Sequence, residues 1–143
     1  MWSRKATGEL ARKKLTMESE QLTINKSNVL KDKSYSFALA IVKVCRFLQE
    51  EKKEYTLSRQ LLRSGTSIGA MIEEANQAES KADFIHKLSI ANKEANETHY
   101  WIRLLKDTEI INSETGSTLA ENCKEIIRLL TASIKTSKSN LKN

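Results

Sequence analysis

The two histidines, His86 and His99, are the side chains best suited to hold a metal ion beside carboxylates. A di-iron site in a helical bundle takes two Glu-x-x-His pairs and two further glutamates from the other helices. Neither histidine has a glutamate three residues before it, and the nearest match is Asp83 ahead of His86. The spacing therefore argues against a metal site.

Catalytic nucleophiles and acid–base pairs are also missing. No serine or cysteine has a base and an orienting group at a spacing that predicts nucleophilic catalysis. Glu73 and Glu74 are adjacent, but neighbours on a helix point about 100° apart, which favours ion pairing. The run 63–69 has the glycines of a phosphate loop but lacks its flanking strand, glycine spacing and Gly-Lys-Ser/Thr ending. We expect no enzyme and no cofactor.

The cysteines and the hydropathy pattern favour a cytoplasmic protein. Cys45 and Cys123 are far apart, form no Cys-x-x-Cys, and each lies on an apolar helical stripe, which predicts buried free thiols and fits a reducing cytosol. No apolar run approaches the roughly 18 residues of a membrane span, and the N-terminus lacks the apolar core of a signal peptide.

The net charge of +6 is concentrated at the ends of the chain. Residues 1–33 have a net charge of +4, residues 135–143, with Lys142, have +3, and residues 34–134 have −1. Basic tails neutralise phosphates in nucleic-acid complexes, although many are solvated ends without a function. The candidate nucleic-acid-binding residues are Arg4, Lys5, Arg12, Lys13, Lys14, Lys52, Lys53, Arg59, Arg63, Lys135 and Lys138.

These side chains must be positioned by helices, because the 143 residues contain no proline and only four glycines. The central stretch 57–105 has apolar or small residues at alternating spacings of 3 and 4, with a break near Glu79–Ser80. This pattern predicts an αα-hairpin. If the turn centres on Ser80, facing positions sum to about 160. The expected helix-packing pairs are then Gly65 with Ala95 and Gly69 with Ala91, and Arg63 lies level with Glu97.

The rest of the chain predicts one helix before this hairpin and one after it, and capping residues indicate where all four helices begin. The first runs from Asp32 or Ser34 to Glu50, and Thr56 caps the next, which ends near Ala78. The third begins with a capping box at Ser80-Lys-Ala-Asp83. Asn112 or Ser113 caps the last helix, which reaches about Lys135, and Ile110 and Ile111 close the end of the bundle.

The expected organisation is an all-α, antiparallel up-down-up-down four-helix bundle over residues 29–137. Residues 1–28 form a basic N-terminal extension, and residues 138–143 form a polar tail. The extension has no sustained apolar period, so we expect it to be mobile, or to reflect an upstream start or a cloning artefact.

The third helix carries a second, mixed stripe of charged and apolar residues. It is either the solvated shoulder of a helix or a subunit interface, since aromatic residues with charged neighbours are typical of interfaces. The candidate interface residues are Ile90, Glu94, Glu97, Trp101 and Leu104.

The sequence also resembles a known family at unusual positions. These are the runs Leu61-Leu-Arg-Ser-Gly-Thr-Ser-Ile-Gly-Ala70, Ile72-Glu-Glu-Ala75, Ser80-Lys-Ala-Asp-Phe84, Lys87-Leu88 and Glu97-Thr-His-Tyr-Trp101. They resemble the four-helix bundle proteins known as 23S rRNA intervening-sequence proteins, over about residues 30–137. The resemblance implies an antiparallel bundle that assembles into rings, typically pentamers, with no known catalytic activity. Relatives act as accessory proteins of diversity-generating retroelements and bind a reverse transcriptase and nucleic acid.

The leading expectation is a non-enzymatic, ring-forming homo-oligomer that engages RNA or DNA through basic surfaces or tails. The alternative is an accessory scaffold for a reverse transcriptase or another enzyme, without nucleic-acid binding of its own. A reverse transcriptase gene next door would favour the scaffold.

Overall fold

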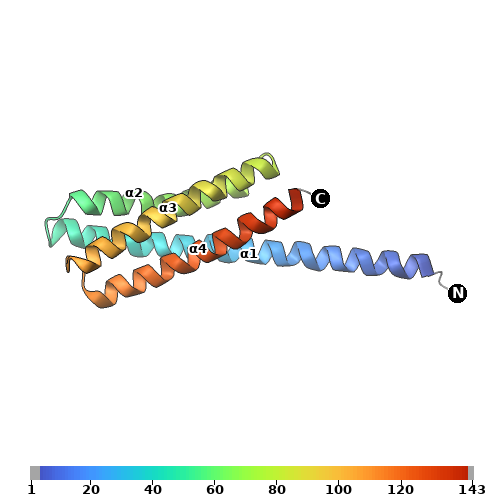
Figure 1. The fold of residues 1–143 in the computed structure, drawn as a ribbon, viewed down its shortest axis with the longest axis horizontal. Coiled ribbons are helices and arrows are strands. Elements are labelled where there is room, and N and C mark those ends of the chain that lie inside the picture. The colour runs from blue at the N-terminus through green and yellow to red at the C-terminus, as the bar shows by residue number, and fades with distance from the viewer. Residues whose placement is uncertain (1–3, 142–143) are drawn as a thin grey trace.

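The computed structural model of the protein describes residues 4–141, without the side chain of Thr23. These residues form the helices α1 (Arg4–Glu50), α2 (Thr56–Asn76), α3 (Lys81–Asp107) and α4 (Ser113–Leu141), and no strand. Each helix packs against its neighbours in the chain, and α4 also packs, least extensively, against α1. Figure 1 shows the antiparallel arrangement, with the N-terminal part of α1 extending past the other helices. This confirms the all-α four-helix bundle.

The core is one continuous apolar cluster to which all four helices contribute. Each helix presents a buried residue about once per turn, as the spacing predicts. The cluster includes both cysteines, which are buried free thiols as expected. Burial raises the pKa of each thiol to about 12, with a smaller contribution from Glu54 at Cys45. The largest fully buried side chains include Ile41, Leu48, Leu61, Ile68, Ile72, Leu88, Ile102, Leu105, Ile126 and Leu130.

α1 begins at Arg4, so the expected helix start at Asp32 or Ser34 is wrong. No proline interrupts residues 4–50, and local bonds such as Thr16 Oγ1 to the Arg12 carbonyl, 2.9 Å, lie along the helix. Leu30 is the first buried residue of α1, and Ser27 Oγ donates to Asn76 Oδ1 of α2 at 3.0 Å. We call residues 4–25 the N-terminal arm. The arm has no apolar period because its side chains are not buried in the bundle, and periodicity reports burial rather than helicity.

The other helix ends largely follow the prediction. Ser80 Oγ accepts from the Asp83 amide at 3.1 Å, and Asn112 Oδ1 accepts from the Thr115 amide at 2.7 Å. Ile111 is buried and Ile110 packs against the core at this end. α2 ends at Asn76, two residues before the expected Ala78. α4 continues to Leu141, past the expected end at Lys135, because nothing in this polar segment breaks a helix. The proposed division at residues 28 and 137 stays a prediction.

The cap of α2 differs from the prediction that Thr56 supplies it. Thr56 is the first helical residue, and the N-cap residue Tyr55 makes no side-chain hydrogen bond. The Glu54 carboxylate instead accepts from the amides of Thr56, Leu57 and Ser58 at 3.0, 2.8 and 2.8 Å. A carboxylate here satisfies orphan donors and interacts favourably with the helix dipole.

Glu54→Ala is therefore expected to lower the free energy of unfolding by about 1–2 kcal/mol, as for loss of an N-cap. Urea denaturation followed by circular dichroism measures this change. The control is Glu51→Ala, an exposed acidic residue in the same loop. Equal effects of the two substitutions would show that Glu54 acts only through surface charge.

The hairpin has the predicted register but a different rotation. Arg63 Nη2 lies 2.6 Å from both carboxylate oxygens of Glu97, which confirms that these residues are level. The expectation that Gly65 and Gly69 face α3 is wrong, because a Cβ on either glycine would point at α1. A Cβ on Gly65 would lie 2.8 Å from Ile41 Cγ2, and one on Gly69 would lie 3.6 Å from the Ser34 carbonyl oxygen. Ala91 and Ala95 are buried in the core from α3.

Candidate functional site

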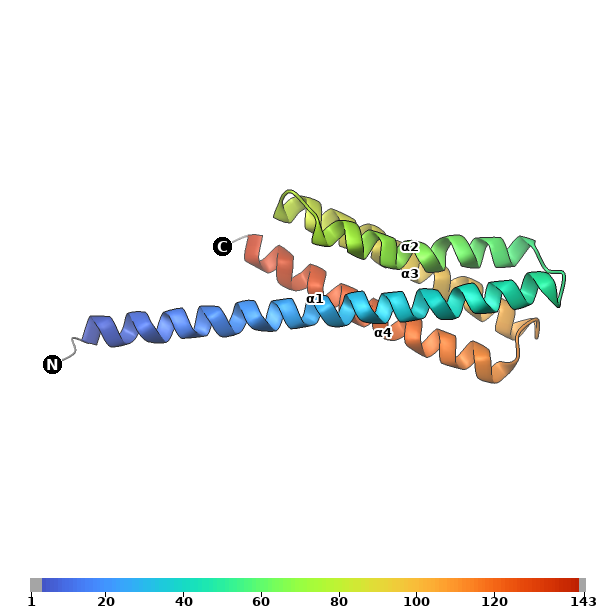
Figure 2. The same cartoon turned by 180° about the vertical axis from the view of Figure 1, so that it is seen from behind.

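The basic candidate residues lie in four separate places. Arg4, Lys5, Arg12, Lys13 and Lys14 are exposed on the N-terminal arm. Figures 1 and 2 show from opposite sides that the N-terminal part of the arm extends past the other three helices, while its C-terminal part lines a hollow together with residues of α3 and α4. Lys13 Nζ lies 3.8 Å from Glu9 Oε1, an exposed i,i+4 pair that offsets little of the arm's positive charge. The N-terminal part of the arm thus presents basic side chains on several sides of the helix.

The second group lies at the other end of the bundle, where α1 turns into α2. Lys52 and Lys53 are in the connecting loop, and Arg59 is exposed in the first turns of α2. Lys52 Nζ lies 6.0 Å from the centre of the Phe47 ring, a cation–π distance. In Figure 1 this loop lies at the opposite end from the chain termini. These residues therefore share no surface with the arm.

Arg63 is bound within the chain. Besides its contacts with Glu97, its Nη1 lies 3.4 Å from Glu94 Oε2. The hydrogen bond with Glu97 is the main cause of a raised Arg63 pKa. The pKa of Glu94 is also raised, because its burial outweighs the opposing effect of Arg63. Two carboxylates offset the charge of Arg63, which makes it a weak candidate for binding phosphate.

The second stripe of α3 lies at the edge of the bundle. Its members Ile90, Glu94, Glu97, Trp101 and Leu104 are all partly buried. Trp101 packs against the core, and the Tyr100 ring meets it edge-on with centroids 5.0 Å apart. The indole Nε1–H of Trp101 is buried and reaches no acceptor within residues 4–141. A buried donor without an acceptor is costly, so this position needs an explanation.

A third basic feature was missed in the sequence. Lys124, Arg128, Lys135 and Lys138 are exposed on α4 at separations of four, seven and three residues. This spacing places them on one face of the helix, and we call them the cationic ridge. Lys135 and Lys138 were candidates only as part of a tail, and Lys142 lies outside the described residues. The alternating 3 and 4 spacing that revealed the apolar stripes would have revealed the ridge if applied to the basic residues.

The ridge begins where α4 packs against α3, since Cys123 Sγ lies 3.2 Å from the Ala95 carbonyl oxygen; His99 is on the same part of α3. Its pKa is lowered, first by burial and then by the positive charges of Arg103 and Lys124, while Glu121 opposes them. Arg103 Cζ also lies 6.0 Å from the centre of the Tyr100 ring, which is 49% exposed. One cation therefore lies by an accessible aromatic ring, and a second, from α4, acts on the neighbouring residue His99.

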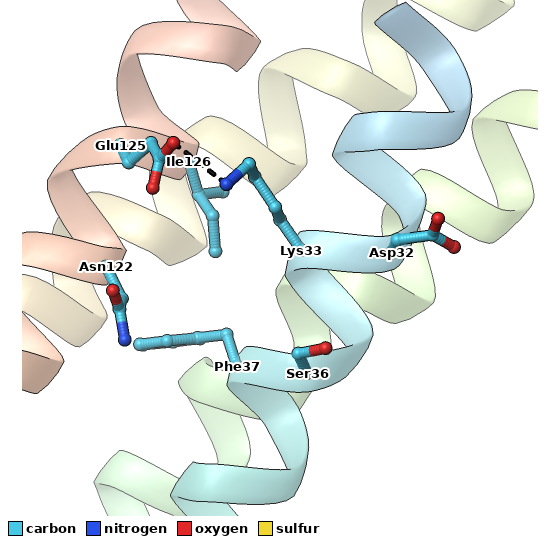
Figure 3. A pocket seen from close by; sticks show the side chains of 7 residues that line it. All are labelled: Asp32, Lys33, Ser36, Phe37, Asn122, Glu125 and Ile126. Atoms are coloured by element: carbon cyan, nitrogen blue, oxygen red, sulfur yellow. Dashed lines mark ion pairs between the residues drawn. The ribbon is translucent and has the colours of Figure 1, made fainter. Parts of the chain in front are cut away.

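The hollow between α1 and α4 is a weaker candidate for a functional site than the basic surfaces. It has a volume of about 310 Å³, and Lys33 Nζ bridges its two walls by lying 2.9 Å from Glu125 Oε1. Figure 3 shows this ion pair across the opening, with Phe37 reaching toward Asn122 beneath it. Within residues 4–141 no three His, Cys, Asp or Glu side chains gather in a group that could hold a metal ion. None of the helices over the same residues has the length and hydropathy of a membrane span.

Comparisons with known proteins agree with the fold. Residues 26–132 match the family described as 23S rRNA-intervening sequence protein. The chain is also 55% identical to a protein of unknown function from the S23 ribosomal protein family of Bacteroides thetaiotaomicron. The crystal structure of that protein matches with a TM-score of 0.76, over 77% of this chain and 98% of that one. A search of curated proteins gave no match. The family match begins directly after the N-terminal arm, and it shows that this chain belongs to the 23S rRNA-intervening sequence protein family.

Proposed function

We propose that this protein is a non-catalytic helical bundle that assembles with copies of itself and engages RNA or DNA through basic surfaces. The observation that carries the proposal is the N-terminal arm. Residues 4–14 hold five basic residues against one acidic residue, Glu9, on a helix that stands clear of the bundle. Phosphates can approach such a helix from several sides, and neutralising them releases counterions. The family description, which names 23S rRNA, supports the same direction.

The assembly half of the proposal rests on α3. Ile90, Trp101 and Leu104 are apolar side chains only partly covered by their own bundle, beside the charges of Glu94 and Glu97. An apolar centre with a polar rim is the usual anatomy of a subunit interface. The assembly that the family resemblance favours is a ring of five copies. A monomeric mass in light scattering at micromolar concentration would contradict it.

The nucleic-acid half predicts a salt-sensitive mobility shift with a labelled structured RNA. The five basic residues of the arm, each replaced by glutamine, should weaken binding at least tenfold at physiological salt. They should also flatten the plot of log affinity against log salt by about 0.7–0.9 per lost phosphate contact. The control is Lys52→Gln with Lys53→Gln, at the other end of the bundle. No shift of the unmodified protein at low or physiological salt would rule out nucleic-acid binding by the protein alone.

A second candidate function is an accessory scaffold for a partner enzyme such as a reverse transcriptase, with nucleic acid contacted only in the complex. It is favoured by apolar side chains on the arm that are 53–69% exposed. These are Leu10, Leu15, Met17, Leu22 and Ile24. Copurification with a neighbouring gene's reverse transcriptase, lost when these residues are replaced by serine, would support it. RNA binding by the full-length protein in the absence of a partner enzyme would favour the first proposal.

A further inference from the structure

The cationic ridge follows one face of α4. Lys138 follows Lys124 by 14 positions, or about 21 Å of helix at 1.5 Å per residue. Residues 126–141 contain no acidic residue, so no carboxylate of α4 interrupts the face beyond Glu125. Glu125 itself pairs with Lys33 of α1. At the start of the ridge, Lys124 Nζ lies 3.9 Å from Glu121 Oε1, a long ion-pair distance.

An exposed aromatic ring lies on α3, which packs against the start of the ridge: Cys123 Sγ lies 3.2 Å from the Ala95 carbonyl oxygen. Tyr100 leaves nearly half its surface to solvent, while its contact with Trp101, at an interplanar angle of 72°, supports one side of the ring. Arg103 lies over the ring, and both Arg103 and Lys124 are close enough to His99 to lower its pKa. The ring is therefore accessible on one side, supported by Trp101 and close to the positive charge of Arg103.

These features together fit one ligand chemistry. Cations on successive turns can follow a linear chain of phosphates, and an accessible aromatic ring can stack on a base. A base is free to stack on a side chain only when it is unpaired, since a duplex keeps its bases stacked inside. We propose that the α3–α4 face binds single-stranded nucleic acid, with phosphates along the cationic ridge and a base on Tyr100. This inference rests on the proposed nucleic-acid binding but assigns it a site separate from the basic residues 4–14 of the arm.

The test uses fluorescence anisotropy of the full chain with two probes, a 12-nucleotide oligouridine and a 12-base-pair RNA duplex. Tyr100→Leu removes the stacking surface and should weaken oligouridine binding about tenfold, as expected for loss of one stacked base. Tyr100→Phe keeps the ring and should bind like the unmodified protein. The ridge variant, with Lys124, Arg128, Lys135 and Lys138 replaced by glutamine, should flatten the salt dependence by up to about 3, from four contacts of about 0.7 each. Duplex binding should not respond to Tyr100→Leu.

Each alternative outcome contradicts the inference in a recognisable way. Equal losses from Tyr100→Phe and Tyr100→Leu would exclude stacking. Displacement of oligouridine by polyglutamate at equal charge would identify an acidic protein as the ligand instead. If the arm variant abolishes binding and the ridge variant has no effect, the inference fails while the proposed function stands. If the unmodified protein binds neither probe at low salt, both fail. Unchanged thermal melting of every variant ensures that the losses are local.

Discussion

Gly65→Ala is expected to lower the free energy of unfolding by about 1–3 kcal/mol, the usual cost of overpacking a core. The added Cβ would lie 2.8 Å from Cγ2 and 3.0 Å from Cγ1 of Ile41. Ile41 is fully buried, and its branched side chain has little rotamer freedom on a helix, so it cannot move aside cheaply. Either α1 and α2 separate or the side chain is strained. Urea denaturation gives the change in free energy, and a melting curve should shift down by several degrees.

Gly69→Ala is the matched control, because it makes the same change one turn later. A Cβ there would lie 3.6 Å from the carbonyl oxygen and Oγ of Ser34, an ordinary contact distance. Alanine is also better than glycine in a helix by about 1 kcal/mol. The stability of this variant should be unchanged or higher. Equal destabilisation by the two substitutions would contradict the argument that the close approach of Ile41 sets the cost at Gly65.

The glycines show what the sequence could and could not predict about the fold. The antiparallel register follows from equal rise per residue, and the Arg63–Glu97 contact confirms it. The rotation of α2 does not follow, because a stripe of small and apolar residues shows that a face is buried without showing which neighbour covers it. α2 buries a wide face between α1 and α3, and its glycines lie on the α1 side. A position level with Ala91 or Ala95 therefore need not point its Cβ toward α3.

The candidate site was predictable only in part, for a related reason. The net charge of each segment identified the two basic ends of the chain. In the structure both ends are helical, as parts of α1 and α4. Lys124 and Arg128 were missed because they belong to a body whose net charge is nearly zero. What identifies them as part of a basic surface is their spacing along the helix and not the number of basic residues in the segment. Arg63 was a candidate nucleic-acid-binding residue because of its charge alone, although the predicted hairpin register placed it opposite Glu97 and so already indicated an ion pair.

Trp101→Ala is expected to raise the dissociation constant of the assembly by about 30-fold or more, the effect of losing an interface hot spot of at least 2 kcal/mol. The ring is partly buried in its own bundle, and its Nε1–H is shielded without an acceptor within residues 4–141. A neighbouring copy that covers this edge of α3 could supply the acceptor and bury the rest of the ring. Light scattering over a dilution series measures the loss of mass, and circular dichroism reports helix content. Tyr35→Ala, on an exposed residue of α1, is the control.

Trp101→Phe separates the indole donor from the apolar ring. In an isolated bundle this change removes an unsatisfied donor, whose burial costs about 1–3 kcal/mol, so the variant should be as stable as the unmodified protein or more stable. In an assembly in which a second copy accepts the hydrogen bond, the same change should lower the mass at a given concentration. Weakened assembly with undiminished monomer stability would therefore place the partner of Nε1 in another subunit. Lost helix content with intact stoichiometry in Trp101→Ala would instead make the residue part of the core, because the ring would then support its own fold and no neighbour.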